Sequence, residues 1–196
     1  AWLEPLGLGA PRLHETCLAL YETQPNKLLL NYGTRIDPSV LTVAEAESQC
    51  LDGFIVKIFT GTWDAPVQQS NDVFCATRYT YESWAAPLAA WQSLTFSNVR
   101  NNFFVIQTAT APQADWYSDA DMAILIANMR DLARVAKEAG FVGLCFDLEA
   151  YSPSHPFQYD TQAQYPTKTL AEYKAKVRYW AHVMMDEMIS VFPDFK

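Results

Sequence analysis

Four continuous apolar runs, each followed by a segment with helical character, constrain the fold of this chain more than any other feature. The runs lie at 27–33, 53–59, 102–109 and 142–149, and they do not alternate between apolar and polar residues. Such runs are typical of parallel strands that are covered on both faces. Parallel strands in turn need crossover connections, which are usually helices. The sequence therefore predicts an α/β fold built from strand–helix units, arranged as a barrel or as an open doubly wound sheet.

Helix signals separate these runs. Residues 38–50 read as a helix with Asp37 as its N-cap, and residues 81–94 read as a second helix. Ser118 precedes a third segment with apolar residues at steps of three and four, which Gly140 is well placed to end. A fourth helical segment follows Thr169, and Thr169 and Glu172 have the spacing of a capping box.

The number of units bears on the domain organisation. A complete (β/α)8 barrel usually needs roughly 250 residues, whereas this chain has 196 residues and four units. We expect one partial barrel domain of the TIM type over 1–196, the N-terminal half of the barrel, with an irregular extension over 1–25. Residues 191–196 read as the lead-in to a fifth strand. Further C-terminal residues or a second chain would then complete the barrel.

Composition excludes several classes of function. The net charge of −8 argues against nucleic acid and anionic membranes as partners, and no apolar run is long enough to span a membrane. No glycine-rich phosphate loop follows any strand, so we expect no nucleotide cofactor. The cysteines lack metal-type spacing, and we expect no metal site and no other cofactor. These cysteines are Cys17, Cys50, Cys75 and Cys145.

Two acids end the fourth apolar run. Asp147 and Glu149 are two residues apart, so in a strand their side chains would point to the same side. Burying charge is costly, and a buried strand does not need two acids at its end. At the carboxyl end of a barrel strand, such residues are typically catalytic. The alternative is a salt-bridged pair at the end of the sheet that involves Lys57.

The segment around these acids resembles a known signature. Residues 142–149, Val-Gly-Leu-Cys-Phe-Asp-Leu-Glu, resemble the strand-four signature D-G-x-D-x-D-x-E of the family 18 chitinase-like glycoside hydrolases. The glycine and the final D-x-E are kept, and Val142 and Cys145 replace the first two aspartates. The resemblance implies that Glu149 protonates the glycosidic oxygen and that Asp147 orients the substrate and stabilises the developing cation.

Other side chains are candidates for substrate binding. Residues at strand ends would line the same cavity, and aromatic residues in loops would offer flat platforms to sugar rings. For Lys57 the alternative is a rim position or a structural pair with Asp147, and for the aromatic residues it is packing. The candidates are Asn31, Tyr32, Lys57, Gln107, Tyr151, Trp63, Trp84 and Trp116.

These observations favour a carbohydrate-active protein. We expect a glycoside hydrolase that uses general acid/base catalysis, and a secreted or periplasmic location. One alternative is a non-catalytic carbohydrate-binding or assembly protein on a degenerate barrel. Another is a metal-dependent lyase or isomerase that uses the same carboxylates.

Overall fold

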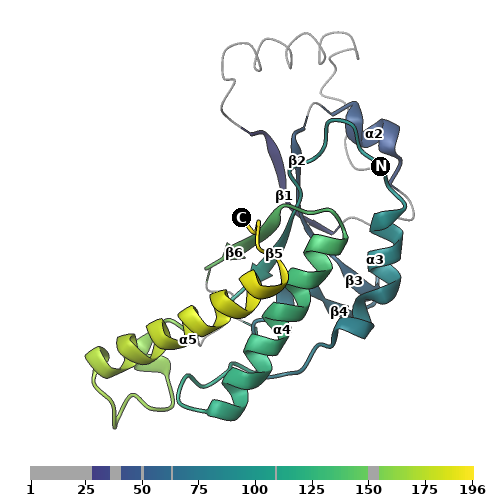
Figure 1. Cartoon of the computed structure of the whole chain (residues 1–196). Helices are drawn as coiled ribbons and strands as arrows, with labels where there is room; N and C mark the ends of the chain where they lie inside the picture. Colours follow the sequence, from purple (N-terminus) through teal and green to yellow (C-terminus); the bar gives the residue numbers. More distant parts are fainter. Residues whose placement is uncertain (1–27, 36–40, 50, 63, 109, 150–154) are drawn as a thin grey trace.

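A computed structural model of the chain has a four-stranded parallel sheet at its centre (Figure 1). The structure describes residues 28–35, 41–49, 51–62, 64–108, 110–149 and 155–196. The sheet contains β1 (Leu30–Arg35), β2 (Gly53–Lys57), β5 (Phe103–Gln107) and β6 (Gly143–Asp147), in the order β1-β2-β5-β6. All three pairings are parallel, as the continuous apolar runs predicted, and the α/β class is confirmed. Among the described strands the order never reverses, as it would in a doubly wound sheet.

The first strand is shifted along the chain from its predicted position. It pairs with β2 from Leu30 opposite Gly53 to Arg35 opposite Lys57. Asn31 and Tyr32 therefore lie near the beginning of β1, and the expectation that they end this strand is wrong. The hydrogen-bonded ladder, which hydrophobicity alone does not reveal, decides where the strand stops. The predicted extension over 1–25 lies outside the described residues.

The long connection after β2 contains a hairpin that the sequence analysis did not predict. β3 (Phe59–Gly61) pairs antiparallel with β4 (Pro66–Gln69), and a short 3-10 helix, η1 (Ser70–Asp72), follows directly. Ser70 joins this insertion to the end of β2. Its backbone N–H donates to the Ile58 carbonyl at 2.8 Å, and its hydroxyl accepts from the Ile58 N–H at 3.1 Å.

The first helix differs from its prediction. α2 (Val43–Glu47) is only five residues long, and Thr42 caps it by accepting from the Glu45 N–H at 3.2 Å. The predicted cap, Asp37, lies outside the described residues.

The later helices agree better with their signals. η2 (Tyr81–Trp84) continues into α3 (Ala85–Gln92), within the predicted 81–94. Ser118 caps α4 (Asp119–Glu138), which ends before Gly140 at a φ of 73°. Thr169 and Glu172 form the complete capping box of α5 (Leu170–Val191).

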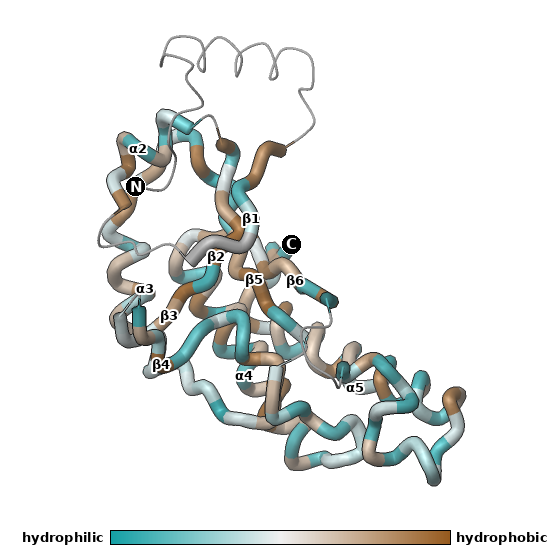
Figure 2. The backbone as a smooth tube through the Cα atoms, turned by 180° about the vertical axis from the view of Figure 1, so that it is seen from behind, coloured by the Kyte–Doolittle hydropathy of each residue, from teal (hydrophilic) through white to brown (hydrophobic). Residues whose placement is uncertain are grey.

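The hydrophobic core lies between the helices and one face of the sheet. Phe54 and Val56 of β2, Phe104 and Ile106 of β5 and Leu144 of β6 all belong to one buried cluster, together with residues from every α-helix in the described ranges. α4 and α5 lie side by side across this face (Figure 1). Figure 2 shows the brown apolar stretches of the strands in the middle of the molecule.

Side chains alternate along a strand, so the residues between the core positions point to the opposite face. The described α-helices pack on the core side, so we call this opposite face the helix-free face of the described structure, or helix-free face for short. Along β2, β5 and β6 it carries Ile55, Lys57, Phe103, Val105, Gln107, Cys145 and Asp147.

The outer side of β6 carries one further rung of parallel pairing. The Lys196 N–H donates to the Val142 carbonyl at 3.1 Å, and the Leu144 N–H donates to the Lys196 carbonyl at 3.2 Å. This alternation is that of a parallel ladder. Gly143 lies at this rung, where a Cβ atom would meet the Lys196 carbonyl oxygen at 1.8 Å. The contact therefore excludes any larger residue at 143.

No helix in the described ranges is both long enough and apolar enough to cross a membrane.

Candidate functional site

Three polar residues occupy the last positions of three neighbouring strands. Lys57 ends β2, Gln107 ends β5 and Asp147 ends β6, and all three point to the helix-free face. Gln107 and Asp147 are direct register partners. Ile55 pairs with Phe103, so Lys57 lies level with Val105. It is therefore two residues nearer the beginning of the strands than Gln107 and Asp147. The structure thus brings together at one edge of the sheet three of the residues that we predicted.

The two acids do not share a strand. β6 ends at Asp147, and Glu149 lies two residues beyond it. The Glu149 N–H donates to Asp147 Oδ1 at 3.0 Å, which closes a turn of the kind that aspartate side chains commonly form. Asp147 is 7% exposed, whereas Glu149 is exposed. The expectation that both acids lie on one strand is therefore corrected, because the strand ends at Asp147 and a turn places Glu149 beyond it.

The chain beyond the acids is fastened to the rest of the molecule. His155 Nε2 lies 2.9 Å from the Leu148 carbonyl, and its Nδ1 accepts from the Phe157 N–H at 3.2 Å. The Pro156 carbonyl oxygen accepts from Trp116 Nε1 at 2.7 Å and from the Tyr173 hydroxyl at 3.0 Å. The turn that carries Glu149 is thereby tied to α5 and to the segment before α4.

The hairpin insertion contributes polar groups to the same edge. Asn71 is 3% exposed, and its Nδ2 donates to Gln107 Oε1 at 2.7 Å and to Asp72 Oδ1 at 2.9 Å. Gln69 Nε2 donates to Asp72 Oδ2 at 3.3 Å. We call Gln69, Asn71 and Asp72 the insertion wall. The wall reaches the end of β5 through the bond between Asn71 and Gln107.

Burial perturbs two titratable groups beside this edge. Desolvation raises the pKa of the Asp72 carboxyl, and the positive charge of Lys57 opposes part of that rise. Burial also raises the pKa of the Cys145 thiol, with a smaller contribution from the charge of Asp147. A raised thiol pKa disfavours the reactive thiolate.

Two of the predicted aromatic platforms are packed in the core. Trp84 is 0% exposed and stacks on Tyr79, with ring centroids 6.2 Å apart, and Trp116 is 3% exposed. Neither indole ring presents a face to solvent, so the packing alternative applies to both. Trp63 and Tyr151 lie outside the described residues.

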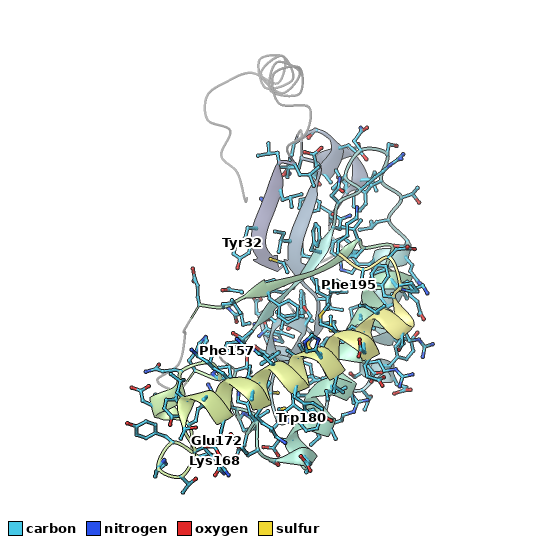
Figure 3. All side chains as sticks on the ribbon, turned by 60° about the vertical axis from the view of Figure 1, so that its left-hand side comes forward. Tyr32, Phe157, Lys168, Glu172, Trp180 and Phe195 are labelled. Carbon is cyan, nitrogen blue, oxygen red and sulfur yellow. The ribbon has the colours of Figure 1, made fainter. Side chains whose placement is uncertain are left out.

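Two candidates on the first strand, Asn31 and Tyr32, lie away from this edge. Asn31 is the register partner of Phe54 and so shares its core-facing side, whereas Tyr32 pairs with Ile55 on the helix-free face. Tyr32 is 55% exposed and lies far from Trp180 on α5 (Figure 3). Its position near the beginning of β1 keeps it away from the carboxyl ends of the other strands.

Sequence reasoning missed the insertion wall. The run Gln68-Gln69-Ser70-Asn71-Asp72 is the longest polar stretch between the second and third apolar runs, and this was the available signal. No spacing rule links Asn71 to Gln107, which is 36 positions away, because the contact arises from the path of the hairpin.

No protein-family model matches the chain, and no match is found among curated proteins or solved structures.

Proposed function

We propose that this chain forms part of a carbohydrate-active β/α barrel and hydrolyses glycosidic bonds, with Glu149 as the general acid. One observation carries the proposal. An exposed glutamate follows the carboxyl end of a parallel strand, and a buried aspartate holds its backbone in a closed turn. Active sites of β/α barrels lie at the carboxyl ends of the strands.

The proposed chemistry uses the two acids differently. Protonated Glu149 gives its proton to the glycosidic oxygen as the bond to the anomeric carbon breaks. Asp147 keeps the Glu149 turn in place, and its negative charge stabilises the cation that develops on the sugar ring. Water then attacks the anomeric carbon, assisted by a second carboxylate.

The arrangement of the strands and helices also supports this proposal. The four parallel strands follow the order of the chain, and the helices pack on one face of the sheet, as they do in a barrel. In the proposed barrel a further strand, from residues after Lys196 or from a second chain, lies against β6 and supplies the second carboxylate.

A second candidate function is carbohydrate binding without catalysis. Cys145 lies two residues before Asp147 on the same strand and points to the same face. The family 18 signature that this segment resembles has an aspartate at this position. Asp147 therefore lacks an acidic neighbour on its own strand. This loss favours a degenerate site that holds a glycan and does not cleave it.

Glu149→Gln tests the hydrolase. The amide keeps the shape of the side chain and cannot donate a proton as an acid. Release of reducing ends from a polysaccharide panel, and of nitrophenol from aryl glycosides, should fall by about 10²- to 10⁴-fold. Glu82→Gln, at an exposed glutamate of η2, is the matched control and should keep full activity.

Two results would remove the assignment. Full activity of Glu149→Gln excludes Glu149 as the acid. Binding of a glycan by the completed barrel, with no hydrolysis of any substrate in the panel, favours the non-catalytic alternative.

A further inference from the structure

Hydrogen bonds attach the insertion wall to the backbone at the end of β2. Ser70 is 0% exposed and makes two hydrogen bonds with the backbone of Ile58, which fix η1 against the end of β2. Gln69 and Asn71 flank this anchor, and both bond to the carboxylate of Asp72. The insertion therefore presents its polar side chains in one arrangement.

Asn71 sets the orientation of Gln107. Both Nδ2 hydrogens of Asn71 are used, one on Gln107 Oε1 and one on Asp72 Oδ1. Because Asn71 donates to the Gln107 carbonyl oxygen, the amide N–H groups of Gln107 must point away from it. No partner for these N–H groups exists among the described residues. A half-buried amide with both donors unused is a group that a ligand can satisfy.

The groups beside Gln107 include both hydrogen-bond donors and acceptors. Lys57 is half-buried, and no carboxylate in the described part of the chain lies within ion-pair distance of its ammonium group. Asp72 accepts two hydrogen bonds, whereas a carboxylate has room for about four. Asn71 Oδ1 is buried and has no hydrogen-bond partner in the described ranges. Such a polar atom is costly unless something else bonds to it.

This pattern discriminates between classes of ligand. A hydroxyl group donates and accepts, so a polyhydroxylated ring can satisfy a mixed set of donors and acceptors. Among Lys57, Gln107, Asp147 and the insertion wall, only Lys57 is a cation, and a phosphate or a sugar acid would bring a negative charge close to Asp72 and Asp147. Neutral sugars avoid this repulsion.

We propose that Lys57, Asp72 and Gln107 form a subsite that recognises the hydroxyl groups of a neutral sugar ring, with Asn71 as a positioning residue. Lys57 and Gln107 donate to ring hydroxyls, and Asp72 accepts from one of them. Gln107 is the register partner of Asp147, so the subsite adjoins the turn that carries Glu149. The inference rests on the proposed function for the identity of its ligand as a sugar.

Titration of the 196-residue chain with methyl glycosides tests the subsite. The probes are methyl glucoside, galactoside and mannoside and their single-deoxy analogues, followed by NMR or calorimetry. Gln107→Glu keeps the oxygen that accepts from Asn71 and removes both donors. We expect it to weaken binding of at least one neutral glycoside by about tenfold or more. Asn98→Ala, at an exposed asparagine, is the control and should bind as the unmodified chain does.

Deoxy sugars identify the hydroxyl that Gln107 contacts. The unmodified chain should prefer the parent glycoside to the analogue that lacks this hydroxyl, and Gln107→Glu should lose the preference. Asn71→Ala should weaken binding on its own and add little in the Gln107→Glu background, because both changes remove one interaction. If the role of Asn71 were purely structural, the effects of Asn71→Ala and Gln107→Glu on binding would instead add. Should Asn71→Ala fail to fold, Gln107→Glu still decides the outcome, because Gln107 is only half-buried.

The results separate this inference from the proposed function. Unchanged binding by Gln107→Glu overturns the subsite, as does binding of glucuronate or glucose 6-phosphate in preference to every neutral glycoside. Hydrolysis that requires Glu149 but is unaffected by Gln107→Glu overturns the subsite alone. Binding that depends on Gln107, without hydrolysis by the completed barrel, supports the subsite and removes only the hydrolase.

Discussion

Asp147 holds the backbone of Glu149 through a 3.0 Å hydrogen bond from the Glu149 N–H to its carboxylate. The buried acid thus acts structurally on the exposed one, although the two side chains lie in different surroundings. Changes at Asp147 should alter both stability and activity, because its carboxylate accepts the Glu149 N–H.

Substitutions at Asp147 should rank by their ability to accept this bond. Asp147→Asn keeps an oxygen that can accept from the Glu149 N–H, and Asp147→Ala does not. We expect Asp147→Ala to lower the free energy of unfolding by about 1 kcal/mol more than Asp147→Asn. Urea unfolding of both variants measures the difference. Equal stabilities would show that the turn contributes nothing.

Asn128 should be among the most sensitive positions of α4. It is 1% exposed, and its side chain bonds to the backbone of three residues, with distances of 3.0 Å to Val73, 2.7 Å to Thr77 and 2.8 Å to Tyr79. Asn128→Leu fills a similar volume and leaves these groups unsatisfied, which should cost about 3 kcal/mol. Thermal unfolding, with the exposed Asn98→Ala as control, checks the loss. A stability within about 0.5 kcal/mol of the unmodified chain would contradict the assignment.

The capping box of α5 should make stability depend on pH in the acidic range. The Thr169 backbone N–H and hydroxyl both donate to Glu172, and the backbone bond is the larger cause of the lowered pKa of the Glu172 carboxyl. Because the folded pKa lies below the unfolded one, this contribution is fully present above the ordinary glutamate pKa. It is lost as pH falls through the lowered value.

Glu172→Gln should therefore be less stable than the unmodified chain at neutral pH, and the difference should shrink below about pH 4. Denaturant unfolding across this pH range measures it. Asp186→Asn, at an exposed acid of the same helix, is the control and should leave the pH profile unchanged. A constant difference at all pH values would show that the charge of Glu172 plays no part.

Tyr173 should make stability depend on pH in the alkaline range. It is 3% exposed and donates to the Pro156 carbonyl, and burial is the main cause of its raised pKa. With a folded pKa above the unfolded one, the contribution is present below about pH 10 and is lost as pH rises further. Tyr173→Phe should be less stable at neutral pH, and its stability should fall less steeply in alkali.

The control for this prediction is Tyr165→Phe. Tyr165 is 48% exposed, so removal of its hydroxyl should leave the alkaline profile unchanged. Identical alkaline profiles for Tyr173→Phe and the unmodified chain would contradict the role of Tyr173.

Local patterns in the sequence predicted the repeated unit and several of its boundaries. Continuous apolar runs indicate parallel strands because both faces of such strands are covered, and each run did become a strand of the central sheet. Ser118, Gly140 and Thr169 marked helix ends correctly, because a cap depends on residues only a few positions apart. The polar residues at the ends of the third and fourth runs could be recognised from the same local pattern, whereas the second run was expected to continue past Lys57 to Phe59.

Tertiary structure alone decided which of these groups meet. Asn71 reaches Gln107 only because a hairpin follows β2. The two strands of this hairpin pair Thr60 with Gln68, and the sequence between them contains no strong turn motif. Trp84 and Trp116 were predicted near the sugar because they lie in connections, yet packing against the sheet buries both. Local sequence sets the conformation of a segment, whereas burial and long-range contacts depend on where the whole chain places it.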